Sequence, residues 1–116
     1  MALHNDKGRE GEEAACLFLS LRGYRLLERN WRSHHYEIDI IADYYGEIVF
    51  VEVKTRRNED FLPALAAVDE EKQENVRAAA RHYLNLKRLD APYRFDIITV
   101  VGETKPYTFK HYVAAF

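Results

Sequence analysis

Residues 37–55 read EIDIIADYYGEIVFVEVKT, and this stretch carries the strongest structural signal in the chain. The segments 37–42 and 47–55 are rich in isoleucine and valine, which favour strands, and the intervening DYYG ends in glycine. Two such runs separated by a short turn are typical of a β-hairpin. The sequence therefore predicts two neighbouring antiparallel strands.

Charged residues interrupt the apolar pattern of this hairpin. Side chains alternate between the faces of a strand, which places Glu52 and Lys54 on one face and the valines of 47–55 on the other. By the same rule, Glu37 and Asp39 share a face of the first strand. Antiparallel pairing would bring Asp39 close to Glu52, and adjacent carboxylates repel each other unless a cation lies between them. Because oxygen ligands on a rigid sheet suit Mg²⁺ (or Mn²⁺), the hairpin predicts a divalent-metal site.

Each of these charges also has an ordinary structural explanation. Glu52 and Lys54 could form an ion pair on a solvated face of the sheet. An acid in a first helical turn, such as Glu12, favours the helix dipole without any further role. Helical periodicity does not separate Glu12 from Glu13, because each shares a stripe with apolar residues. Gln73, taken alone, is a solvated helix residue.

The rest of the chain adds helices and strands around the hairpin. Residues 12–22 (EEAACLFLSLR) predict a helix that ends at Gly23, and residues 63–86 contain a second, alanine-rich helix that is clearest from Asp69 onward. Further strands are expected at 24–31, 94–101 and 107–113. The order α-β-β-β-α-β-β predicts a single α/β domain over residues 1–116, with a mixed sheet flanked by helices.

Composition excludes several classes of protein. The chain has 116 residues, of which 47% are hydrophobic and 31% charged, as is typical of a globular domain. Its one cysteine, Cys16, excludes an intrachain disulfide and a cysteine-rich zinc site. No stretch approaches the roughly 18 apolar residues of a membrane span, and the first residues lack the apolar run of a signal peptide. We therefore expect a cytoplasmic protein with no membrane partner.

The net charge leaves nucleic-acid binding open. The formal charge is −2, whereas nucleic-acid binders are usually basic. If four acids of the chain surround a metal, however, removing their charges from −2 leaves +2. Arg32, Arg56 and Arg57 are the candidates for contacts with backbone phosphates, with ordinary surface charge as the alternative.

Seven segments of the chain together resemble a known family. They are GREGEEAA, GYRLLERNWR, EIDIIA, IVFVEVKTRR, EKQENVRAAARHYL, RFDIITV and the terminal AAF. In this order, and over nearly the whole chain, they look like the YraN family of small proteins, which is placed in the PD-(D/E)XK nuclease superfamily. The resemblance implies a restriction-endonuclease-like αβββαβ core, in agreement with the expected element order.

The resemblance also implies roles for individual residues. Asp39 and Glu52 would bind Mg²⁺ or Mn²⁺, and Lys54 would position or activate the attacking water. Glu12 falls where related Holliday-junction resolvases carry a glutamate on the first helix, which makes it a third metal ligand. Two auxiliary residues are Glu37, within the family's G-E-I-D string, and Gln73, where some branches use a glutamine near the site.

The implied function is that of a metal-dependent nuclease that hydrolyses phosphodiester bonds in nucleic acid. DNA is the favoured substrate, with branched or junction DNA among the candidates, and analogy with junction-cleaving enzymes suggests a homodimer. The alternatives are a nucleic-acid-binding module with little or no catalytic activity, and a scaffold partner in DNA processing. Tyr36 and Leu62 stand where the family usually has glycine, a departure that bears on the geometry of the substrate and leaves the ligand set whole.

Overall fold

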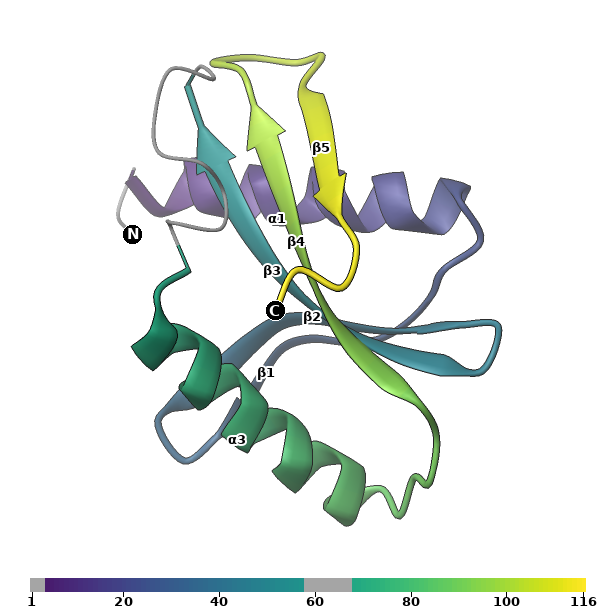
Figure 1. The fold of residues 1–116 in the computed structure, drawn as a ribbon. Helices are drawn as coiled ribbons and strands as arrows, with labels where there is room; N and C mark the ends of the chain where they lie inside the picture. Colours follow the sequence, from purple (N-terminus) through teal and green to yellow (C-terminus); the bar gives the residue numbers. More distant parts are fainter. Residues whose placement is uncertain (1–3, 58–67) are drawn as a thin grey trace.

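The computed structural model describes residues 4–57 and 68–116 of the chain. Its elements are α1 (His4–Leu21), β1 (Arg25–Ser33), β2 (Tyr36–Tyr44), β3 (Glu47–Arg56), α3 (Glu70–Leu86), β4 (Tyr93–Val101) and β5 (Thr108–Tyr112). The strands form a sheet in the order β1-β2-β3-β4-β5, in which β3 and β4 are parallel and the other neighbours antiparallel. The helices α1 and α3 cover opposite faces of the sheet (Figure 1). The expected mixed α/β fold, consistent with an αβββαβ core, is confirmed.

The sheet opens into a fork between β2 and β3. The last pair between these two strands is Ile40 with Val51. Beyond it, β2 continues along β1 as far as the pair of Ser33 with Tyr36. Beyond the same pair, β3 turns away from β2 and continues along β4 to Arg56. One arm of the fork is therefore β1 and β2, and the other contains β3, β4 and β5 (Figure 1).

Two apolar clusters hold the helices on the sheet. The alternation expected for β3 is confirmed, because Val49 and Val51 pack in the cluster under α1 whereas Phe50 packs in the cluster under α3. On β2, however, Ile38 belongs to the α3 cluster and Ile40 to the α1 cluster. Side chains two positions apart normally share a face, so β2 rotates about its own axis at Asp39, where the fork begins.

The first helix begins earlier than the sequence predicts. The expected start at residue 12 is wrong, since α1 begins at His4 and contains both Gly8 and Gly11. Gly11 is buried, and a Cβ atom at this position would lie 2.4 Å from Thr55 Oγ1 on β3. Glycine lowers helix propensity by about 1 kcal/mol relative to alanine, but here it lets α1 lie directly against β3.

The second helix lies within the expected range and begins where its sequence signal is clearest. Asp69 is the N-cap of α3 and accepts a hydrogen bond from the Lys72 amide at 2.9 Å, as an aspartate at this position commonly does. The helix therefore starts at Glu70, and residues 63–67 of the longer expected helix lie outside the described part of the chain. Neither α1 nor α3 is long and apolar enough to cross a membrane.

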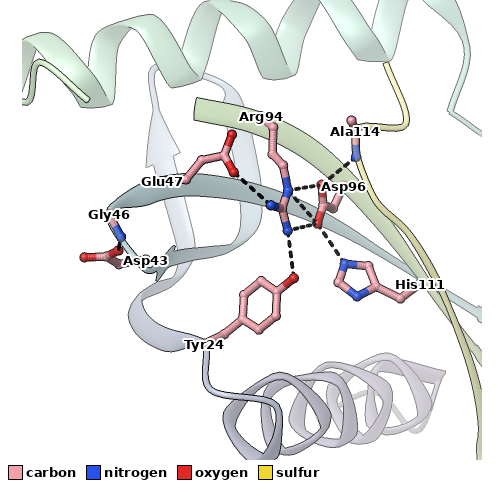
Figure 2. A network of polar contacts seen from close by, with 8 residues as sticks. All are labelled: Tyr24, Asp43, Gly46, Glu47, Arg94, Asp96, His111 and Ala114. Atoms are coloured by element: carbon pink, nitrogen blue, oxygen red, sulfur yellow. Dashed lines mark hydrogen bonds and ion pairs between the residues drawn. The ribbon is translucent and has the colours of Figure 1, made fainter. Parts of the chain in front are cut away.

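A buried ionic network ties β4 to its neighbours (Figure 2). Asp96 is fully buried and accepts hydrogen bonds from Arg94 Nε at 3.0 Å, His111 Nε2 at 2.7 Å and the Ala114 amide at 2.9 Å. Arg94 in turn donates to the Tyr24 hydroxyl and to Glu47. Burial alone would raise the pKa of Asp96, but the three donors hold it below its ordinary value. This acid is therefore a fully partnered structural group.

The close approach at Gly11 can be tested by substitution. We expect Gly11→Ala to lower the free energy of unfolding by about 1–3 kcal/mol, because the added methyl group overlaps Thr55. Gly8→Ala is the matched control on the same helix, since nothing lies within 4 Å of its added Cβ. That variant should gain up to about 1 kcal/mol from helix propensity. Chemical denaturation of both variants, and of Gly11→Ala with Thr55→Ala, measures the effect. Equal changes at the two glycines would contradict the close approach.

Candidate active site

Two acids from adjacent strands meet at the fork. Asp39 lies on β2 directly beside Ile40, the last residue that pairs with β3. Its Oδ2 atom accepts a hydrogen bond from the Val53 amide at 2.8 Å, so a side chain takes the place of a strand partner where the two strands separate. Glu52, the chain neighbour of Val53, is buried, with 4% of its surface exposed. The expected proximity of the Asp39 and Glu52 regions is therefore present in the fold.

The electrostatics of the two acids differ from those of Asp96. The pKa of Asp39 is raised to about 7, mainly by burial, then by the charge of Glu52 and to a smaller extent by that of Glu12. The hydrogen bond from Val53 and the charge of Lys72 act in the opposite direction without reversing it. Burial likewise raises the pKa of Glu52, although Lys72 and Lys54 lower it. For both carboxylates, the nearby positive charges and hydrogen-bond donors do not offset the effect of burial on the pKa.

The contacts of Glu52 satisfy only one of its two oxygens. Its Oε2 atom lies 3.2 Å from Lys72 Nζ and 3.9 Å from Lys54 Nζ. Its Oε1 atom is buried and finds no hydrogen-bond partner among the described residues. A buried polar atom without a partner costs roughly 1–3 kcal/mol, and more when it is charged. The second oxygen is therefore a point at which a cation would lower the energy of the site.

These acids fit a magnesium ion. No group of three His, Cys, Asp or Glu side chains forms a ready-made metal cage within residues 4–57 and 68–116. Mg²⁺ does not need one, because it binds through one or two carboxylates and completes its shell with water and substrate phosphates. Asp39 and the free oxygen of Glu52 supply ligands of that kind.

The structure separates Glu12 from Glu13. The residues on the Glu12 stripe, including Ala15 and Leu19, are buried against the sheet. Leu17, on the Glu13 stripe, is 60% exposed. Glu12 is partly buried and close enough to raise the pKa of Asp39 by its charge, whereas the Glu13 side chain is exposed.

The remaining expected site residues take different positions. Lys54 is partly buried beside Glu52, as strand alternation predicts. Glu37 is near enough to raise the pKa of Glu52, and its Oε2 atom lies 3.7 Å from Arg32 Nε. The side-chain Nε2 of Gln73 donates a hydrogen bond to the Val68 carbonyl oxygen at 2.9 Å and so holds the chain that enters α3. In this structure Gln73 acts on the backbone before the helix.

The three candidate arginines lie on both arms of the fork. The Arg32 side chain is 74% exposed on β1, opposite Glu37 on β2. Arg56 ends β3, with its guanidinium 3.3 Å from the Thr55 carbonyl oxygen, and Arg57 follows as an exposed residue. Tyr36 begins β2, and its ring lies 4.6 Å from that of His35. Leu62 lies outside the described residues.

Sequence reasoning missed Lys72. This residue makes the shortest ion pair of Glu52, although it comes from α3 rather than from the hairpin. Its position in the first turn of α3, next to Gln73, was the only signal in the sequence, and a lysine there is ordinarily solvated. Gly11 was missed as well, because its role depends on the contact with Thr55 on another element.

Comparison with known proteins gives the family. Residues 11–100 match the model of the family described as "Uncharacterised protein family UPF0102". The chain belongs to the UPF0102 family. The UPF0102 protein of Phocaeicola vulgatus is 44% identical over 116 residues, which cover 100% of this chain and 96% of the relative. For the relative in Bacteroides thetaiotaomicron the identity is 46% with the same coverage. The Koribacter versatilis relative is 46% identical over 99 residues, or 84% of this chain and 69% of its own length. None of these names states an activity.

The raised pKa of Asp39 predicts a pH-dependent stability. An acid that is harder to ionise in the folded protein destabilises the fold increasingly as the pH rises from its ordinary pKa of 3.8 to about 7. Asp39→Asn keeps an acceptor for the Val53 amide but removes this charge. In metal-free buffer, the free energy of unfolding of the variant should therefore increase relative to that of wild type as the pH rises. The increase should be at least about 1 kcal/mol between about pH 4 and about pH 8.

Denaturant titrations at several pH values measure this difference. Asp90→Asn, at an exposed aspartate, is the control and should follow wild type at every pH. A constant difference between Asp39→Asn and wild type across the range would show that Asp39 ionises normally in the folded protein.

Proposed function

We propose that this protein is a metal-dependent nuclease that hydrolyses phosphodiester bonds, with Mg²⁺ or Mn²⁺ as its cofactor. The observation that carries the proposal is the pair of carboxylates at the fork of the sheet, the partly buried Asp39 and the buried Glu52. Both have a raised pKa, and Glu52 Oε1 has no partner among the described residues. A site with an excess of buried negative charge and an adjacent lysine suits a divalent cation and a phosphate.

The acids at the fork would bind the metal in such a reaction. Asp39 and Glu52 would hold the metal, and Glu12, whose charge acts on Asp39, would be a third acid, although the three form no ready-made cage among the described residues. The hydrogen bond from the Val53 amide fixes the direction of the Asp39 carboxylate, which a rigid ligand set requires. When bound, the metal would polarise the phosphoryl group and lower the pKa of a bound water.

Lys54 supplies the positive charge of the protein itself. Its ammonium group lies 3.9 Å from Glu52, on a strand and partly shielded from solvent. A fixed charge in such a place stabilises the negative charge that develops on the phosphoryl oxygens in the transition state. The arginines at positions 32, 56 and 57 would bind backbone phosphates on either side of the fork, which positions a substrate without reading its sequence.

DNA is the substrate class that we propose, with branched or junction DNA as the first structures to test. A homodimer would place two such sites on two strands, and we propose it as the assembly on this substrate. The second candidate is a binding module that does not cleave. One observation favours it: Lys72 already pairs with Glu52 and offsets part of the charge that a metal would neutralise.

Metal binding should stabilise the fold. Mg²⁺ or Mn²⁺ that binds the folded protein alone raises the melting temperature in proportion to the logarithm of its concentration over Kd. Asp39→Asn should lose most of this increase, because it replaces one of the two charged ligands with a neutral one. Thermal unfolding at a series of metal concentrations measures the effect, with Asp90→Asn as the control. Equal metal-dependent shifts in Asp39→Asn and wild type would argue against a shared site.

Cleavage and binding should respond to different residues. We expect Lys54→Ala to lower the cleavage rate at saturating DNA by about 10² or more, with little change in affinity. The double variant Arg56→Ala with Arg57→Ala should show weaker binding, a shallower salt dependence and a nearly normal rate at saturation. Assays with linear, flapped and four-way DNA and Mg²⁺ or Mn²⁺ measure the rates, with Asp39→Ala as the inactive control.

The binding-module alternative makes the opposite prediction. It is correct if wild type cleaves none of these DNA structures with either metal and the lysine and arginine variants lose affinity only.

A further inference from the structure

Lys72 is held at a fixed place beside the candidate site. The Asp69 side chain accepts a hydrogen bond from the Lys72 amide at 2.9 Å, and the Asp69 carbonyl accepts one from the Gln73 amide at 2.9 Å. The Gln73 side chain donates a hydrogen bond to the carbonyl oxygen of Val68. Three hydrogen bonds therefore fix the first turn of α3, and this turn directs Lys72 at Glu52.

The ion pair of Lys72 with Glu52 is unequal in its exposure. The Lys72 ammonium lies 3.2 Å from Glu52 Oε2, closer than that of Lys54 at 3.9 Å. The Lys72 side chain is 38% exposed, whereas that of Glu52 is 4% exposed. The lysine can therefore move its charge into solvent by rotating its flexible stem, but the carboxylate cannot leave the site.

A divalent cation at Glu52 would compete with this ammonium group. Both are attracted by the same carboxylate, and two cations held within a few ångströms in a partly dry site repel each other. Binding of a metal to the free protein must therefore weaken or break the Lys72 contact. A phosphate near the metal offers the released ammonium a new partner, since lysine binds phosphate as a point charge.

We propose that Lys72 is an internal counter-ion of Glu52 that competes with the divalent cation in the free protein and moves to a substrate phosphate in the complex. The proposal rests on the proposed metal site. It makes the binding of metal and of nucleic acid mutually reinforcing, because each removes Lys72 from the position that opposes the other. Without substrate, the lysine keeps metal affinity low and stabilises the buried acid.

Calorimetric titration of Mn²⁺ into the free protein tests the competition directly. Lys72→Met removes the charge but keeps an unbranched side chain, and we expect it to bind Mn²⁺ about tenfold more tightly than wild type. Its melting temperature without metal should fall, and the increase caused by Mn²⁺ should be larger than in wild type. Lys72→Arg retains the charge, and its Mn²⁺ affinity should stay within about twofold of the wild-type value.

Lys87→Met, at the C-cap of α3, is the matched control. Lys87 lies at the other end of α3, where it pairs with Glu28 at 3.8 Å, so its loss should leave Mn²⁺ affinity unchanged. Lys72→Gln provides a second neutral variant, with the same expected gain in affinity, if Lys72→Met does not fold without metal.

The outcomes separate this inference from the proposed function. Unchanged or weaker Mn²⁺ binding by the neutral Lys72 variants, with clear binding by wild type, overturns the counter-ion and leaves the metal site standing. An equal gain in Lys87→Met also overturns it, because the effect would then come from net charge. If neither wild type nor any variant binds Mn²⁺, both the counter-ion and the proposed metal site are wrong.

Discussion

The buried carboxylate of Glu52 is the group around which this fold is organised at the fork. Strand β3 carries it into a layer otherwise filled by apolar side chains such as Phe50. Burying a charge is strongly unfavourable unless partners offset it, and here two lysines reach only one of its oxygens. Three features of the fold surround this charge. Strand β2 separates from β3 beside it, the Val53 amide fixes the direction of Asp39, and α3 brings Lys72 to Glu52.

The protein contains a second buried acid, Asp96, whose carboxylate has several hydrogen-bond donors around it. Asp96 receives donors from a guanidinium, an imidazole and a backbone amide, and its pKa is lowered (Figure 2). Within residues 4–57 and 68–116, Asp39 and Glu52 have no such set of donors, and their pKa values are raised. The fold can therefore surround a buried acid with donors, as it does at Asp96, and the raised pKa values of Glu52 and the partly buried Asp39 are a local feature that packing alone does not explain. Sites with perturbed pKa values are where ligands and catalysis are commonly found.

The sequence predicted those features that arise within one element or between chain neighbours. The hairpin, the alternation of β3 and the approach of Asp39 to Glu52 follow from period-two patterning and a short turn. Features that depend on packing between distant elements were not predicted. The start of α1 was misplaced because the benefit of Gly11 lies in its contact with Thr55, and no helix propensity contains that information. Lys72 was missed for the same reason, since its partner is on a strand.

The parallel pairing of β3 with β4 has a consequence for the order in which the protein folds. The β2–β3 hairpin joins residues that are close in the chain, whereas β4 reaches β3 only after the connection that contains α3. Local contacts form quickly, and pairings between distant segments form slowly because a long loop must close first. The hairpin can therefore form without α3, whereas the ion pair of Lys72 with Glu52 exists only once α3 has docked on the sheet.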